Sequence, residues 1–143
     1  MPYEYLEHGV TSDVTFRAWG RDLDALFTAA ADATTHLMVE ELASIVPSET
    51  LPVEARAEAL DLLLVRFLEE LLFHKDARGL LLRARDVHVV SAGGGYQIRA
   101  TLAGEAIDPD KHALAADVKA VTLHGLRVEC TGGGWQAEVT VDV

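Results

Sequence analysis

A leucine-rich run between residues 60 and 72 constrains the fold of this chain more than any other feature. Its apolar residues recur at the i, i+3, i+4 spacing of one helix face, and Gly79 follows as a stop signal. Leu62 and Val65 widen the apolar stripe, which predicts a helix over about 58–76 that is buried on more than one side. The stripe consists of Leu60, Leu63, Leu64, Phe67, Leu68, Leu71 and Leu72.

A second helix is predicted over about 23–39. Asp22 is a suitable N-cap residue, and Asp24 puts a negative charge in the first turn, where the helix dipole favours it. Apolar residues then recur at helical spacing, which indicates an amphipathic helix with one face on the core. These residues are Leu23, Leu26, Phe27, Ala30, Thr34, Leu37 and Met38.

The remaining segments alternate apolar and polar residues as β-strands do. Pro52 confines its strand to a sheet edge or a bulge, because proline cannot donate a hydrogen bond to a neighbouring strand. The glycine triplets 93–95 and 132–134 indicate hairpin turns rather than phosphate loops, because a strand follows each. The pattern predicts an α+β fold: a single domain over 1–143, with two amphipathic helices packed on a mixed or antiparallel sheet of about seven strands. The strands are expected at 3–8, 13–19, 50–57, 80–90, 96–104, 118–130 and 135–143.

The charge of the chain excludes several kinds of partner. The 143 residues include twelve Lys and Arg and 23 Asp and Glu, which gives a formal net charge of −11. No strong direct binding to nucleic acid or to an anionic membrane is expected, although an acidic protein can act on a basic RNA-binding partner. One cysteine permits no intramolecular disulfide, and the N-terminus lacks the pattern of a secretion signal. These features predict a cytoplasmic protein.

The last strand carries a carboxylate on its polar face. Alternation places Asp142 on the same side as Glu138 and Thr140, one residue before the terminal carboxylate of Val143. Two carboxylates this close repel each other unless a cation or a basic side chain lies between them. The other interpretation is a frayed, solvated chain end.

Asp13 and Lys119 are two further charged candidates. Asp13 opens the second strand and is either a turn residue or an oxygen ligand, since hard cations such as Ca²⁺ and Mg²⁺ need several such oxygens. The spacing allows Asp13 and Asp142 to meet but does not require it. Lys119 is either a solvent-facing strand residue or the charge partner of a carboxylate cluster. The histidines His36, His74, His88 and His112 have unrelated spacings, so a transition-metal site is not expected, and no catalytic motif names a reaction.

Several segments, in the right order over essentially the full chain, resemble the archease family. The run Lys-Ala-Val-Thr-x-His at 119–124 and the Asp-Val ending are the most specific of them. The segments are Tyr3–His8, Thr11–Val14, Arg17–Gly20, Gly104–Glu105 with Asp108 and His112, Asp117–His124 and Val141–Val143.

The resemblance implies a single α+β domain and an accessory role. Archeases activate the GTP-dependent RNA ligase of tRNA splicing and RNA repair, promoting its guanylylation and multiple turnover without being ligases. The family's calcium site corresponds here to Asp13 and Asp142, with oxygens of Val143 on the same ion, and Mg²⁺ or Mn²⁺ would suit the same ligands. Asp13, Lys119 and Asp142 are the residues implied for ligase activation.

The chain departs from the family pattern at two places. Gly9 and Val10 are inserted after His8, which displaces that histidine from its usual position. Leu123 stands where many members carry a tyrosine beside His124. Neither change removes an acidic ligand.

Two other functions stay open on the residues alone. One is a metal-dependent hydrolase of a small molecule, which would need an open cleft with a perturbed acid or base and would turn over alone. The other is a general chaperone-like interaction module, suggested by the broad apolar face of 60–72. An adaptor would be inert alone and active only with its partner.

Overall fold

The computed structural model describes residues 1–6 and 12–143, and within them seven strands and two α-helices follow one another along the chain. The first predicted strand is therefore described only to Leu6, and His8, Gly9 and Val10 lie outside the described residues. The elements are β1 (Tyr3–Leu6), β2 (Asp13–Gly20), α1 (Leu23–Met38), β3 (Glu49–Ala57), α2 (Leu60–Arg78), β4 (Leu80–Ala92), β5 (Gly95–Ala106), β6 (Ala120–Thr131) and β7 (Gly134–Asp142), with a short 3₁₀ turn at Leu42–Ser44.

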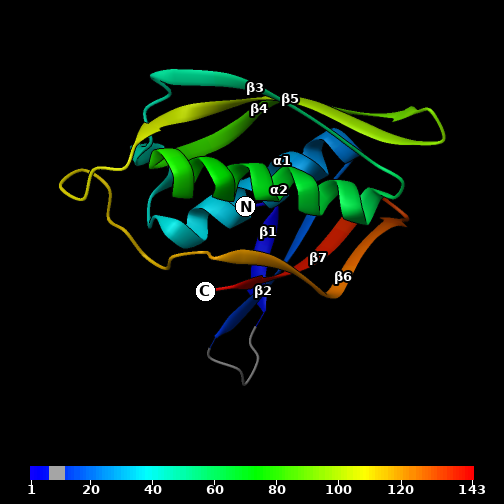
Figure 1. Cartoon of the computed structure of the whole chain (residues 1–143). Coiled ribbons are helices and arrows are strands. Elements are labelled where there is room, and N and C mark those ends of the chain that lie inside the picture. The colour runs from blue at the N-terminus through cyan, green and yellow to red at the C-terminus, as the bar shows by residue number, and fades with distance from the viewer. Residues whose placement is uncertain (7–11) are drawn as a thin grey trace.

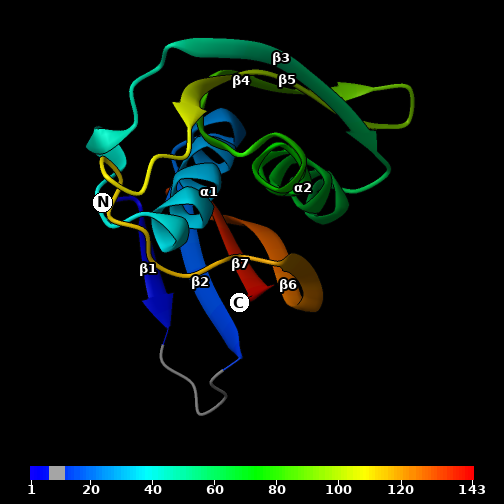
Figure 2. The same cartoon turned by 60° about the vertical axis from the view of Figure 1, so that its left-hand side comes forward.

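The strands form two antiparallel sheets, with the two helices between them (Figures 1 and 2). One sheet has the strand order β1-β2-β7-β6 and the other β3-β5-β4. The α+β class, the two helices and the seven strands are confirmed, and the strands are divided between two sheets rather than joined in one. Pro52 lies in β3, an edge strand, as its missing N–H requires.

Burial on several sides of α2 accounts for this division. Seven of its apolar side chains are buried, while Phe73 near its C-terminal end is 59% exposed. The helix packs against β3, β4 and β5 on one side and β6 on the other. Val65 is buried as expected, whereas Leu62 is 39% exposed near the start of the helix. The helix ends at Gly79, whose φ of +64° provides the left-handed C-cap. In the described part of the chain, no helix is long and apolar enough to cross a membrane.

Helix α1 is fixed by its cap and by one ion pair. The Asp22 carboxylate accepts a hydrogen bond from the N–H of Ala25 at 2.8 Å, as its N-cap position predicts. Arg83 of β4 donates through Nε and Nη2 to the two carboxylate oxygens of Asp32, at 3.0 and 3.1 Å. This bidentate pair fixes α1 to the three-stranded sheet. Both glycine triplets form two-residue hairpin turns, as predicted.

Gly104 in β5 provides a sharp test of this packing. A Cβ atom there would lie 1.8 Å from the carbonyl oxygen of Leu81 in the neighbouring strand β4. Because the obstacle is backbone, it cannot rotate away, so Gly104→Ala should cost about 3 kcal/mol or more of unfolding free energy. Urea denaturation measures the loss.

Gly132→Ala is the matched control, since a Cβ at Gly132 meets no atom within 4 Å. Its effect should stay within about 0.5 kcal/mol of the wild type. Equal stability of the two variants would contradict the close approach of β4 and β5 at Gly104.

Candidate acidic site on the four-stranded sheet

Asp13 and Asp142 are direct cross-strand neighbours at one end of the β2–β7 pair. The N–H of Val143 donates to the carbonyl of Ser12 at 3.0 Å, so Ser12 and Val143, the next pair along the two strands, are hydrogen-bonded to each other. Asp13 and Asp142 therefore form a non-hydrogen-bonded pair, the type in which opposing side chains approach most closely. The strand order, rather than any local pattern, brings the two predicted carboxylates together.

Both carboxylates lie on the polar face of the β2–β7 pair. Ala137, Val139 and Val141 are buried, so the alternating residues face away from the helices, as predicted. Farther along this face, the Glu138 carboxylate accepts from Arg17 at 3.2 Å and pairs with Arg127 at 3.3 Å.

The row of Asp13 and Asp142 differs from its neighbours. Neither side chain makes a hydrogen bond or an ion pair with any other residue of 1–6 and 12–143. One row away, the hydroxyls of Thr15 and Thr140 are 2.7 Å apart, and Thr122 donates to the carbonyl of Thr140 at 3.0 Å. Two like charges thus face each other without compensation from the described protein.

Lys119 contacts this site through its backbone. Its N–H donates to the carbonyl of Asp142 at 2.8 Å, and β6 begins at the next residue, Ala120, later than the predicted start at 118. The Lys119 side chain is exposed and forms no ion pair with the described carboxylates. Its role as a charge partner remains a prediction.

Lys75 is the positioning residue that the sequence interpretation missed. Its ammonium, with the side chain 7% exposed, donates to Asp117 at 2.5 Å and to the carbonyl of Val118 at 2.6 Å, and pairs with Asp76 at 2.9 Å. Burial alone would lower the pKa of Lys75, but the bonds to Asp117 and Asp76 outweigh it and raise the pKa. Lys75 continues the apolar stripe of Leu68, Leu71 and Leu72. A lysine at a position otherwise apolar was the sequence feature that could have indicated a buried ammonium.

The donor set at Asp13 and Asp142 fits a hard cation in part. The described residues contain no group of three or more His, Cys, Asp or Glu side chains arranged to hold a metal. Ca²⁺ takes about six to eight oxygen ligands. Two unpaired carboxylates and nearby carbonyls would therefore fill only part of its coordination sphere, with water or a partner supplying the rest.

Residues 3–143 match the model of the archease protein family (MTH1598/TM1083). The chain belongs to this family. The protein archease of Methanopyrus kandleri is 36% identical over 143 residues, all of both chains. That of Pyrococcus abyssi is 35% identical over 142 residues, covering 99% of this chain and 98% of the relative.

Two solved structures share the fold. Protein 1598 of Methanobacterium thermoautotrophicum superposes with a TM-score of 0.85 at 31% identity, covering 99% of each chain. A Thermotoga maritima protein described as an archease and possible chaperone gives a TM-score of 0.61 at 14% identity, over 98% of this chain and 99% of that one. The predicted family membership is thus confirmed.

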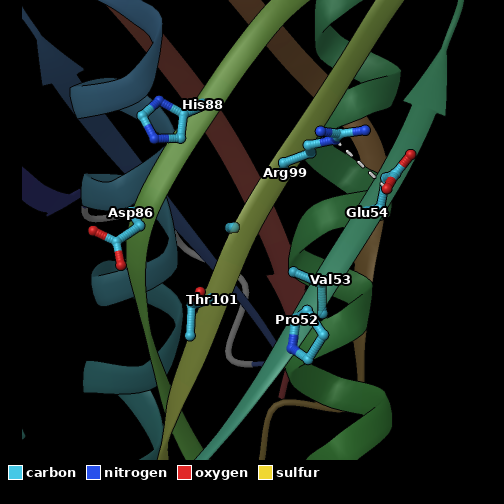
Figure 3. A pocket seen from close by; sticks show the side chains of 8 residues that line it. Pro52, Val53, Glu54, Asp86, His88, Arg99 and Thr101 are labelled. Atoms are coloured by element: carbon cyan, nitrogen blue, oxygen red, sulfur yellow. Dashed lines mark ion pairs between the residues drawn. The ribbon is translucent and has the colours of Figure 1, made fainter.

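A groove on the outer face of the three-stranded sheet is a second polar region of this archease-family chain (Figure 3). It encloses about 570 Å³ and contains the exposed side chains of Asp86, His88, Glu54 and Arg99. Arg99 is already paired with Glu54 at 3.7 Å, while Asp86 and His88 lie on the β4 side of the groove. The charges here are solvated, and the described groove lacks the enclosed acid–base group that a hydrolase requires.

Glu105 secures the long connection that leads to Lys119. Its carboxylate accepts from Lys111 at 2.7 Å, from the N–H of Val46 at 2.7 Å and from the buried His112 at 3.0 Å. The Nδ1 atom of His112 accepts a hydrogen bond from the N–H of Asp108 at 2.9 Å. Nε2 of His112 therefore carries the hydrogen and donates the bond to Glu105. The bond from Lys111, followed by that from Val46, lowers the pKa of Glu105 to about 2.

The repulsion between the carboxylates of Asp13 and Asp142 predicts that removing one of the two charges stabilises the fold. Asp142→Asn removes one of the two facing charges. In the presence of a metal chelator it should raise the unfolding free energy by up to about 1 kcal/mol. Glu138→Gln on the same strand breaks pairs with Arg17 and Arg127 and should give no gain. A loss of stability in Asp142→Asn, measured by urea denaturation in EDTA, would show that the carboxylates are compensated.

Glu105 predicts a pH-dependent contribution to stability. Because the folded-state pKa lies below the ordinary value, the stabilisation is complete above pH 4.5 and is lost as pH falls toward about 2. The stability difference between wild type and Glu105→Gln should therefore be constant near neutral pH and shrink across this window. Denaturation at a series of pH values measures it, with the exposed Glu129→Gln as control. A difference that stays unchanged through acid would contradict this role of the carboxylate.

Proposed function

We propose that this protein is a non-catalytic activator of the GTP-dependent tRNA-splicing and RNA-repair ligase in the cytoplasm. It promotes guanylylation of the ligase and allows multiple turnover, and joins no RNA itself. Membership of the archease family supports the role. The observation that carries it is the Asp13–Asp142 pair, which no other described residue compensates and to which the family resemblance assigns the acidic ligands.

The acidic pair is proposed to bind Ca²⁺, with Mg²⁺ or Mn²⁺ as alternatives. Asp13 and Asp142 supply carboxylate oxygens, and Val143 supplies a carbonyl oxygen beside them. A bound cation supplies positive charge that offsets the repulsion and can attract anionic groups of a partner. The β2–β7 ladder holds the two carboxylates on one edge of the molecule, so a partner can complete the coordination from outside.

Charge complementarity supports a basic protein partner rather than RNA. The formal net charge of −11 repels polyanions but favours approach to a surface rich in Lys and Arg, such as that of an RNA-handling enzyme. Lys119 is an exposed cation whose backbone N–H is hydrogen-bonded to the carbonyl of Asp142. It is proposed to contact the ligase rather than the metal, because it is itself a cation.

The alternatives have weaker support. The apolar face of α2, which suggested a chaperone-like surface, is buried between the two sheets. The groove of Figure 3 is open and its arginine is paired, which argues against a hydrolase. An adaptor role agrees best with the half-buried carboxylate pair, which lacks a compensating partner among the described residues.

Loss of either carboxylate should weaken metal binding. Asp13→Ala and Asp142→Ala are each expected to lower Ca²⁺ affinity at least about tenfold, since even indirect contacts to a metal are worth that much. Both variants should also lose stimulation of the ligase while remaining folded. Titration calorimetry measures the affinity, and the guanylylated fraction of the ligase with GTP measures the stimulation.

Glu138→Gln, which removes a charge from the same face, is the matched control and should keep Ca²⁺ binding. Equal calcium affinity in wild type and both alanine variants would mean that the ion binds elsewhere. No stimulation by an excess of the wild-type protein would refute the ligase role itself.

Lys119 should separate the two parts of the proposal. Lys119→Ala removes the exposed ammonium but keeps the backbone bond to Asp142, so Ca²⁺ affinity should change by less than about threefold while ligase stimulation falls. Arg78→Ala, which removes another exposed cation, should leave both properties intact. Normal stimulation by Lys119→Ala would remove this lysine from the ligase contact.

A further inference from the structure

A pocket of about 700 Å³ lies where β3 ends, α2 begins and the β4–β5 hairpin turns. These three segments lie on the same side of the molecule in both views (Figures 1 and 2). The pocket shares no residue with the acidic pair or with the groove of Figure 3. Two of its residues are arginines, Arg56 and Arg66.

Within residues 1–6 and 12–143, neither of these arginines has an acidic partner, although the protein is strongly acidic. All twelve Lys and Arg lie in the described residues, and seven of them form ion pairs there. Arg56 and Arg66 form no ion pair with any described residue, although acidic residues outnumber basic ones by 23 to 12. Glu58 also lines the pocket, but it pairs with neither guanidinium. The pocket therefore gathers uncompensated positive charge.

Neutral acceptors hold the two guanidiniums in place. Arg66 donates through Nη1 to the backbone carbonyl of Arg56. Arg56 donates through Nη2 to the side-chain oxygen of Gln97 at 3.2 Å. Gln97 is buried and fixed in turn by Glu54 at 2.6 Å. Each guanidinium has five N–H donors, so most of them, and the full charge, remain available.

The other walls combine open backbone with apolar surface. Gly93 and Gly94 have φ values of +57° and +82°, and their turn leaves that wall without side chains. Leu62 is 39% exposed and contributes to the lining with the half-buried Tyr96. An aromatic and an aliphatic side chain next to two arginines suit an anion attached to an apolar or planar group.

We propose that this pocket binds a phosphate group, either free or as the monoester of a small aromatic compound such as a nucleotide. Paired arginines suit phosphate because their planar forks donate several charge-assisted hydrogen bonds to its oxygens. Binding places a negative group between two like charges and offsets their repulsion. The site is independent of the proposed ligase role, because neither arginine contacts the carboxylate pair.

Titration calorimetry of the full chain tests the site with inorganic phosphate and with adenosine monophosphate at fixed ionic strength. Arg56→Gln and Arg66→Gln should each weaken binding at least about tenfold, as expected for loss of a charge-assisted contact. Arg78→Gln is the matched control: it removes an exposed, unpaired arginine at the far end of the same helix and should keep full affinity. Circular dichroism and melting temperature verify that each variant is folded.

Several outcomes decide the proposal. Equal affinity for both probes supports a site for the phosphate group alone. Tighter binding of the nucleotide, with Tyr96→Ala losing only that excess, supports the ester. No saturable binding of either probe overturns the proposal, as does an equal loss in Arg78→Gln, which would reflect overall charge. Should Arg66→Gln fail to fold, Arg66→Lys and Arg56→Gln still test the site, because both change the guanidinium fork.

Discussion

The need to bury α2 on several sides is the constraint on which this structure depends. A helix whose apolar stripe is this wide cannot lie on one sheet with its other side in water, so the strands divide into layers above and below it. The connection over 107–119 carries the chain from the three-stranded sheet to the four-stranded one. There β7 enters between β2 and β6, which places Asp142 opposite Asp13. The acidic site is therefore a consequence of how the core is covered.

Electrostatics distinguishes this site from the rest of its face. Facing like charges on neighbouring strands cost up to about 1 kcal/mol, and the nearby Glu138 avoids that cost by pairing with Arg17 and Arg127. Asp13 and Asp142 retain this cost at one end of the central β2–β7 pair. Native proteins are stable by only about 5–15 kcal/mol, so a cost of this size is a noticeable fraction of the total. The arrangement agrees with a site that is completed by binding.

Local patterns predicted the elements well because each depends on neighbouring residues. The helical stripes, the hairpin glycines and the polar face of Asp142 all follow from periods of 3.6 or 2. Strand order does not, so neither the division into two sheets nor the meeting of Asp13 and Asp142 could be derived from spacing. Lys75 occupied a stripe position, yet its bond to Asp117 joins residues 42 apart and required the fold. No sequence pattern indicated that Arg56 and Arg66 share a pocket, because the pocket forms only where the β4–β5 hairpin meets α2.

Helix α2 contributes a basic side chain to each of the two polar regions, the arginine pocket and the segment that leads to the acidic pair. Arg66 lies near its start and lines the basic pocket, while Lys75, nine residues later, holds the segment that leads to Lys119. At 1.5 Å per residue these positions are about 14 Å apart along the axis. The helix is closely packed between two sheets, so both side chains project from a rigid support rather than from a loop. Rigid placement of this kind fixes the direction of charged groups, which is what recognition of an anion at one end and a cation or partner at the other requires.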